Sequence, residues 1–161
     1  MTIKISDKIP AATFKVMTAD GKGEMTTDNI FNGRKVVIFA VPGAFTGTCT
    51  NAHMPSFLAN YDAIKAKGVD MIACTSVNDI DVMNAWAKST GAEGKIVMLA
   101  DGNAAFAKSV GLEKDLTVAG MGMRSSRYSM IVDNGVVKQL NTESNPGAMT
   151  VSGAETILGQ L

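Results

Sequence analysis

The segment KVVIFAVPGAFTGTC, residues 35–49, runs from a charged residue through an apolar stretch into a small polar turn that ends on a cysteine. Consecutive apolar residues are typical of a strand buried on both faces, so residues 35–41 predict a central strand of a parallel sheet. Pro42 ends this strand, and a helix is expected to begin within the three residues before Cys49. Cys49 then lies beyond the carboxyl end of the strand, where open α/β sheets hold their catalytic groups.

Strands and helices alternate along the chain after Cys49. A first helix is expected to end at Gly68 and to be kinked by Pro55, because proline removes a backbone donor. The elements expected next are a strand at residues 69–77, a helix that Asn78 or Asp79 caps and Gly91 stops, a strand at residues 95–99 and a helix at residues 103–110. Alternating units of this kind form parallel strands with helices on both faces.

Two hairpins lie outside this alternating part. They are predicted at Asp20-Gly21 and at Asn134-Gly135, within RYSMIVDNGVVKQL. Ser152 and Glu155 have the spacing of a capping box for a last helix that ends near residue 161. The order of elements predicts an α/β, thioredoxin-like fold, with a mixed central sheet, helices on both faces and an N-terminal hairpin extension. A flavodoxin-like sheet is the alternative, which the Asn-Gly hairpin fits badly.

Composition limits the class of protein. The 161 residues suit one domain with its own core, so residues 1–161 are expected to form a single domain. The formal net charge is zero and no basic block stands out, which disfavours nucleic acid and membranes as partners. No apolar run approaches the roughly 20 residues of a membrane helix. The N-terminal segment lacks the apolar region of a secretory signal, so a cytoplasmic protein is expected, with a processed organelle protein as the alternative.

The two cysteines, Cys49 and Cys74, carry the most distinctive chemistry. They do not make a disulfide framework, and neither a C-x-x-C pair nor a cluster around the single histidine, His53, provides a metal site. No metal or other cofactor is therefore expected. Unpaired N–H groups at the beginning of a helix favour a thiolate at Cys49. Because an ordinary thiol is already slightly ionised near neutral pH, ionisation alone accelerates attack by at most about tens of fold.

A fast thiol enzyme also needs donors aimed at the charge that develops in the transition state. Thr46 lies three residues before Cys49, so one helical turn brings its hydroxyl to the side of the sulfur. Pro42 closes the turn and is expected to shield the site from water. The cation that is still missing is expected from Arg124 or Arg127, which begin the late hairpin.

The segment PGAFTGTC resembles the active-site motif of peroxiredoxins, in which proline, threonine or serine, and cysteine stand where this chain has Pro42, Thr46 and Cys49. The segments HMP, SVND, AW and RYSMIVDNGVV are similar to the atypical type II group, also called the peroxiredoxin 5 subfamily. The resemblance runs over nearly the whole chain. It implies a thioredoxin fold and a thiol-dependent peroxidase that reduces hydrogen peroxide and alkyl hydroperoxides. Gly47 and Ser56 depart from the proline and glycine usual in this group.

The resemblance also implies roles for single residues and for partners. It implies that Cys49 is the peroxidatic cysteine and passes through a sulfenic acid, and that Arg127 completes the site. Thr46 is then expected to bond the peroxide and Pro42 to exclude water. The later cysteine of some members is absent here, so one-cysteine behaviour is expected, with glutathione and glutaredoxin, or thioredoxin, as the reductant. A homodimer formed through the active-site loops is also implied.

Other residues keep a second interpretation. Cys74 is expected to pack in the core rather than to resolve the sulfenic acid. His53 lies four residues after Cys49; a structural or solvent-facing histidine is expected, and a Cys–His pair of a hydrolase or transferase is the alternative. Phe45 is expected at the peroxide entrance or in a dimer contact. A redox sensor that passes oxidation to a partner is the alternative function, and Ala52 in place of a second cysteine disfavours a thiol–disulfide oxidoreductase.

Overall fold

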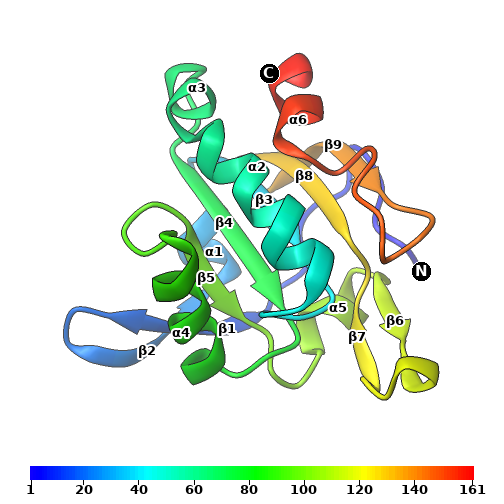
Figure 1. Cartoon of the computed structure of the whole chain (residues 1–161). Helices are drawn as coiled ribbons and strands as arrows, with labels where there is room; N and C mark the ends of the chain where they lie inside the picture. The colour runs from blue at the N-terminus through cyan, green and yellow to red at the C-terminus, as the bar shows by residue number, and fades with distance from the viewer.

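The predicted strand that precedes Pro42 lies inside a seven-stranded sheet. A computed structural model describes residues 1–161, and Figure 1 shows the sheet with helices packed against it. The strands of the sheet are β1 (Thr13–Thr18), β2 (Gly21–Thr26), β3 (Lys35–Ala40), β4 (Met71–Ser76), β5 (Val97–Ala100), β8 (Tyr128–Asp133) and β9 (Val136–Thr142). Their spatial order is β2-β1-β5-β4-β3-β8-β9. β3, β4 and β5 are parallel, whereas β8 runs antiparallel to β3 and β1 antiparallel to β5.

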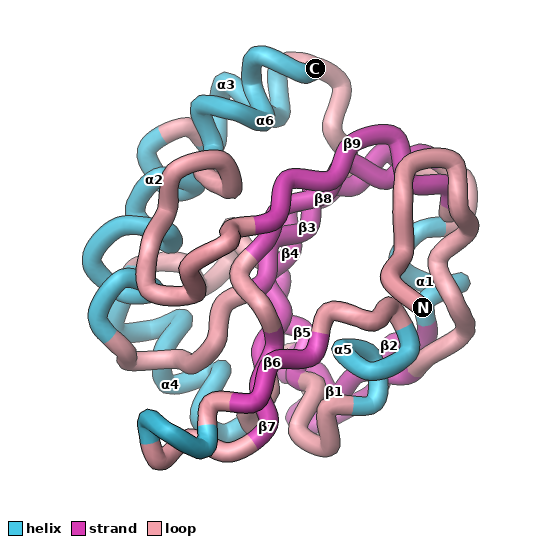
Figure 2. Tube along the Cα trace, turned by 90° about the vertical axis from the view of Figure 1, so that its right-hand side faces the viewer, coloured by secondary structure: helices cyan, strands magenta, loops and turns pink.

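Helices cover both faces of this sheet, as Figure 2 shows. The helices are α1 (Thr27–Phe31), α2 (Met54–Ala59), α3 (Tyr61–Ala66), α4 (Ile80–Thr90), α5 (Ala105–Ser109) and α6 (Ala154–Gln160). One core layer joins Phe39 of β3 to α2, α3, α4 and α6, and the other joins Ile38 of β3 to α1 and α5. This arrangement confirms the predicted mixed sheet with helices on both faces. None of these helices combines the length and apolar character that crossing a bilayer requires.

Both predicted hairpins are present, although the first turns at residues 19–20, one residue earlier than predicted, because Thr18 pairs with Gly21. β1 pairs antiparallel with β2, and β8 pairs with β9. Between β8 and β9, Asn134 and Gly135 have φ values of 48° and 79°, which is the left-handed pair that a two-residue hairpin turn requires. α1 and the small sheet of β6 (Glu113–Asp115) and β7 (Met123–Ser125) do not follow from the sequence pattern. These elements have only three to five residues, too few to show a hydrophobic period.

The helical region after Cys49 differs from the single kinked helix that the sequence predicts. A π-helical turn, η1 (Cys49–His53), comes first, and the N–H of Met54 bonds the carbonyl of Cys49. Pro55 lies in the first turn of α2, but η1 precedes α2 directly, so its missing N–H falls inside a continuous helical region. The break comes instead at Asn60, between α2 and α3.

The structure also decides between the predicted caps. Asp79 caps α4, since its carboxylate accepts from the N–H of Val82. The capping box predicted at Ser152 is wrong, because the N-cap of α6 is Gly153, which makes no side-chain bond. The Ser152 hydroxyl instead donates to the Glu143 carboxylate at 2.7 Å.

Candidate active site

Two side chains meet at the sulfur of Cys49, one from the same turn and one from a distant part of the chain. The Thr46 hydroxyl lies 3.0 Å from Sγ, and Arg127 Nη2 donates to Sγ at 3.1 Å. Thr46 reaches the sulfur because its carbonyl accepts from the N–H of Thr50, which makes the first helical turn. Arg127 reaches it because Tyr128, the next residue, pairs with Ala40 at the end of β3. The structure therefore brings together three residues that the sequence singles out.

The Thr46 hydroxyl has two neighbours and one proton. Oγ1 lies 2.6 Å from the carbonyl oxygen of Gly43 and 3.0 Å from Cys49 Sγ. The carbonyl only accepts, so beside a protonated thiol the hydroxyl donates to Gly43 and accepts from S–H. Beside a thiolate, the same hydroxyl can turn and donate to the sulfur. Thr46 thus suits both states of the thiol without moving its side chain.

Of the two candidate cations, Arg127 contacts the thiol and Arg124 does not. Arg124 Nη1 donates to the carbonyls of Pro42 and Val77 at 3.4 and 3.3 Å, and Arg124 Nε donates to the Met121 carbonyl at 2.9 Å. Arg124 therefore holds the turn after β3 rather than the sulfur. Pro42 itself is buried, and its role in excluding water stays a prediction.

Asn78 supports the same turn. Its side-chain oxygen accepts from the N–H of Ala44 at 2.9 Å and from the Ser76 hydroxyl at 2.6 Å. Asn78 follows β4, the parallel neighbour of β3, so the carboxyl ends of two adjacent strands are joined at the site. The sequence places Asn78 only as a possible helix cap, because the approach of two loops has no local signal.

His53 has a role that the sequence does not reveal. It is fully buried, so a solvent-facing histidine is wrong. Its Nδ1 lies 3.0 Å from Arg127 Nη1, and its Nε2 lies 2.9 Å from the carbonyl oxygen of Ser152. The carbonyl can only accept and the guanidinium can only donate, so the proton is on Nε2 and Nδ1 accepts. No hydrogen bond links His53 to Cys49, and the arrangement is therefore not that of a Cys–His nucleophile pair.

The charge state of His53 follows from its surroundings. Burial and the neighbouring Arg127 guanidinium lower the pKa of His53 from 6.5 to about 3. A neutral imidazole is required for Nδ1 to accept from Arg127. The sequence signal for this role is the spacing of four residues from Cys49, which places both side chains on one face of the helical region.

Arg127 is a buried cation without a carboxylate partner. Its side chain is 2% exposed, and the three ion pairs of the structure involve only lysines as cations. Its Nε donates to the carbonyl of Pro146 at 3.0 Å, so all the groups around it except one are neutral acceptors. A buried charge needs a counter-charge. Of the three acceptors around the guanidinium, only the Cys49 sulfur can carry a negative charge.

Cys74 is a core residue, as predicted. It lies on β4, has no exposed surface and is not joined to Cys49 by a disulfide. Burial raises the pKa of the Cys74 thiol well above its usual value, with a smaller contribution from Cys49. A neutral, buried thiol of this kind is a poor nucleophile.

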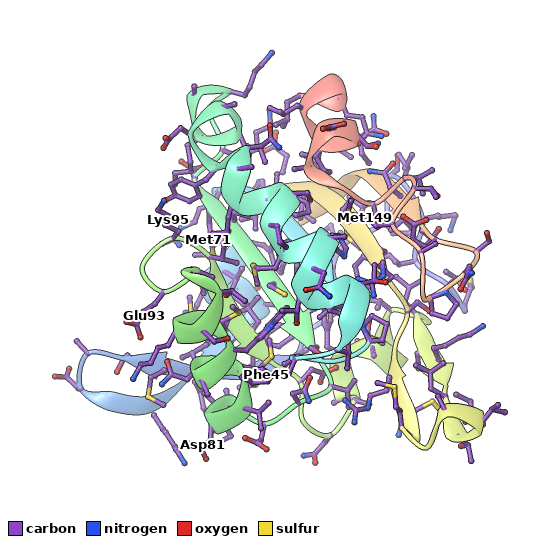
Figure 3. All side chains as sticks on the ribbon, viewed as in Figure 1. Phe45, Met71, Asp81, Glu93, Lys95 and Met149 are labelled. Carbon is purple, nitrogen blue, oxygen red and sulfur yellow. The ribbon has the colours of Figure 1, made fainter.

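Cys49 also has no exposed surface in this conformation. A peroxide is larger than a water molecule, so it reaches the sulfur only when neighbouring groups move aside. Phe45, labelled in Figure 3, is 54% exposed and lies in the turn that leads to Cys49. Its φ of 65° is unusual for a residue with a side chain and marks strain in this turn.

Comparison with known proteins gives matches over almost the entire chain. The family model described as Redoxin matches residues 4–158. The chain is similar to Peroxiredoxin-2E-2, chloroplastic, of Oryza sativa subsp. japonica, with 46% identity over 99% of this chain and 73% of that protein. It is also similar to Peroxiredoxin-2F, mitochondrial, of Arabidopsis thaliana, with 48% identity over 83% of this chain and 66% of that protein. The chain thus spans about two thirds to three quarters of the length of these relatives.

Solved structures match the fold as well. One is reduced Prx3 in complex with H2O2 from Vibrio vulnificus, with 50% identity, a TM-score of 0.94 and 99% of each chain covered. Another is peroxiredoxin 5 from Alvinella pompejana, with 37% identity, a TM-score of 0.80, and 88% of this chain and 90% of that chain covered.

Proposed function

Because the chain belongs to the peroxiredoxin family, of the type II or peroxiredoxin 5 kind, and is a thiol peroxidase, we propose that Cys49 is its peroxidatic cysteine. The observation that carries this assignment is Arg127 Nη2 at 3.1 Å from Cys49 Sγ. A buried guanidinium whose only anionic neighbour can be a thiolate stabilises that thiolate and the charge that forms as it reacts.

The reaction follows from the donors around the sulfur. The Cys49 thiolate attacks the terminal oxygen of hydrogen peroxide or an alkyl hydroperoxide, so an S–O bond forms as the O–O bond breaks. Two electrons pass from sulfur to the leaving oxygen, which takes up a proton and departs as water or an alcohol. Arg127 and the Thr46 hydroxyl donate to the oxygens on which negative charge develops. Cys49 is left as a sulfenic acid, which an external thiol reduces.

Replacement of Cys49 tests this assignment. C49S is expected to abolish peroxide turnover in the presence of a reductant, because a serine hydroxyl is not ionised near neutral pH. C74S is the matched control and is expected to retain turnover, since Cys74 is buried in the core. Peroxide consumption by C49S at the wild-type rate would refute the assignment.

We also propose one-cysteine behaviour, with glutathione and glutaredoxin, or thioredoxin, as the reductant. Cys74 is the only other thiol of the chain, and it is buried on β4. After one equivalent of peroxide, mass spectrometry is expected to find sulfenic acid on Cys49, or a glutathione adduct when glutathione is present. An intramolecular Cys49–Cys74 disulfide would contradict the proposal. Turnover compared with each reductant system then identifies the better one.

The assembly and location are proposals too. A homodimer formed through the active-site loops accounts for exposed apolar side chains near the site, such as Phe45 and Val151. A single domain is supported by two core layers on one shared sheet. A cytoplasmic location stays a prediction, since the names of two similar relatives place them in the chloroplast and the mitochondrion.

A further inference from the structure

The segment between β9 and α6, residues 143–153, lies against the active site (Figure 1, orange to red). Two of its carbonyls hold the side chains that surround the sulfur. Pro146 O accepts from Arg127 Nε at 3.0 Å, and Ser152 O accepts from His53 Nε2 at 2.9 Å. The direction of the guanidinium therefore depends on where this segment places its backbone.

Figure 3 labels Met149 on this segment, beside the helical region that follows Cys49. A further bond joins the two, because the Thr48 hydroxyl donates to the Gly147 carbonyl at 2.6 Å. Since Thr48 precedes Cys49 directly, the segment also contacts the turn that carries the sulfur.

A single carboxylate holds the segment in shape. Glu143 Oε2 accepts from the N–H groups of Thr150, Val151 and Ser152, each at 2.8 Å. The hydroxyls of Ser152 and Thr150 donate to Oε2 and Oε1, each at 2.7 Å. The backbone N–H of Glu143 donates to the carbonyl of Arg127 at 3.0 Å. Glu143 thus joins both ends of the segment at a point fixed beside Arg127.

We propose that Glu143 is a positioning residue of the peroxidase site. Its carboxylate sets the segment so that the carbonyls of Pro146 and Ser152 orient Arg127 and His53, and the guanidinium then faces Cys49. The inference rests on the proposed role of Cys49 and deepens it. Glu143 touches neither the sulfur nor a peroxide, and it acts through Arg127 and His53.

The chemistry of Glu143 suits this role. Five donors converge on its two oxygens, and a carboxylate is the side chain that accepts so many bonds without offering a proton. Although burial by itself raises the pKa of Glu143, the hydrogen bonds from Ser152 and Thr150 hold it at about 2. The carboxylate is therefore charged at every pH at which a thiol peroxidase works.

Two substitutions separate the geometry of this carboxylate from its charge. In E143Q, the amide oxygen can keep the four donors of Oε2, while the amide nitrogen faces the Thr150 hydroxyl, which can accept. E143A loses every one of these bonds. We therefore expect the effects of E143Q to fall between those of wild type and E143A.

The experiment has two readouts, both measured on the chain of 161 residues. The first is kcat/KM for hydrogen peroxide with saturating reductant. The second, without peroxide, is the pH midpoint of Cys49 alkylation by iodoacetamide, followed by peptide mass spectrometry so that Cys74 is not counted. D70A is the matched control, because Asp70 also accepts from a backbone N–H, that of Lys35 at 2.8 Å, at the opposite end of β3. Thermal unfolding of each variant is measured alongside.

We expect E143A to lower kcat/KM by about tenfold to a hundredfold, because a guanidinium displaced by about 1 Å no longer meets the reacting atoms in the productive geometry. The alkylation midpoint is expected to rise, and D70A is expected to leave both readouts within about twofold of wild type. If E143A does not fold, E143Q decides the question with a smaller change in the same direction. Folded E143Q and E143A proteins with wild-type values, or an equal loss in D70A, would overturn the proposal. The alkylation readout does not depend on turnover, so it tests the role of Glu143 alone. Failure of the Cys49 assignment would be seen independently, as peroxide turnover that C49S retains.

Discussion

At the scale of the residue, His53 explains how a buried guanidinium keeps its direction. An arginine side chain has several rotatable bonds, so one contact with Cys49 does not fix it. Each nitrogen of Arg127 donates to a different acceptor, namely His53 Nδ1, Pro146 O and Cys49 Sγ. Three acceptors around one planar group leave it a single orientation, which is the preorganisation that a stabilised transition state needs.

Substitution of Arg127 measures that orientation. R127K keeps the charge but loses the planar fork, so one ammonium cannot reach all three acceptors. We expect kcat/KM for hydrogen peroxide to fall by about a hundredfold to a thousandfold, as on removal of an oxyanion donor. R124K is the control, because Arg124 binds only backbone carbonyls of the neighbouring turns, and it is expected to lose less. An equal loss in both variants would show that the turn, not the guanidinium at the sulfur, limits the rate.

The pKa of His53 predicts a loss of stability in mild acid. The unfolded chain binds a proton at His53 below pH 6.5, whereas the folded chain does so only near pH 3. Since the unfolded state binds more protons in this window, the free energy of unfolding falls as the pH falls, with a slope that approaches about 1.4 kcal/mol per pH unit below pH 6.5. H53Q keeps a donor and an acceptor but does not titrate, so we expect its slope to be smaller. Urea unfolding at several pH values between 6.5 and 5 measures the difference, and equal slopes would contradict the assignment.

At the scale of the element, the turn between β3 and η1 is closely packed around one of its two glycines. A Cβ on Gly43 would lie 3.1 Å from Thr46 Cγ2 and 3.2 Å from both Arg124 Nη1 and Met121 Cε. Gly47, four residues on, has nothing within 4 Å of its Cβ position. A side chain is therefore sterically hindered at Gly43 and free of contacts at Gly47.

This difference gives a matched pair of variants. G43A is expected to push Thr46 away from Cys49 and to lower kcat/KM by about tenfold or more, since small misplacements in a reacting site are costly. G47A is expected to keep activity within about twofold of wild type, because the added methyl meets no atom. Steady-state peroxidase assays compare the two, with circular dichroism to verify folding. Equal activities of the two variants would contradict this prediction, because they would show that the turn accommodates the methyl group of G43A without displacing Thr46 from Cys49.

At the scale of the whole molecule, the sheet decides which distant residues meet. Arg127 and Cys49 are 78 positions apart, and they touch because β8 pairs with β3. The two core layers and the seven strands hold that pairing from both faces. The apolar groups left outside these layers include Phe45, Val118, Met123 and Val151.

The exposed apolar groups lead to a prediction about assembly. We expect a dimer in solution, and we expect F45D to shift it to the monomer, because a charge in a buried contact is unfavourable. I5D is the control, since Ile5 is also exposed, at 51%, but lies in the N-terminal segment. Sedimentation velocity of the three proteins checks this, and a monomeric wild type would refute the proposed homodimer.

The elements that depend on neighbours in the chain were accessible from the sequence. The apolar run of β3, the left-handed pair at Asn134 and Gly135 and the cap at Asp79 each rest on local chemistry, and each agrees with the structure. The one-turn spacing of Thr46 and Cys49 is of the same kind. The capping box at Ser152 failed because its hydroxyl bonds Glu143, nine positions earlier in the chain.

By itself, then, the sequence determined the strands of the main sheet, the turn at Asn134 and Gly135 and the positions of the two thiols, because backbone preferences and side-chain periods act over a few residues. Local patterns left both Arg124 and Arg127 open as the cation, and the family resemblance pointed to Arg127. The tertiary structure decided that Arg127 contacts Cys49, that His53 is neutral and holds Arg127, and that the segment after Glu143 carries the acceptors. These outcomes depend on the strand pairing and on burial, which bring together groups about eighty to a hundred positions apart and remove the water between them.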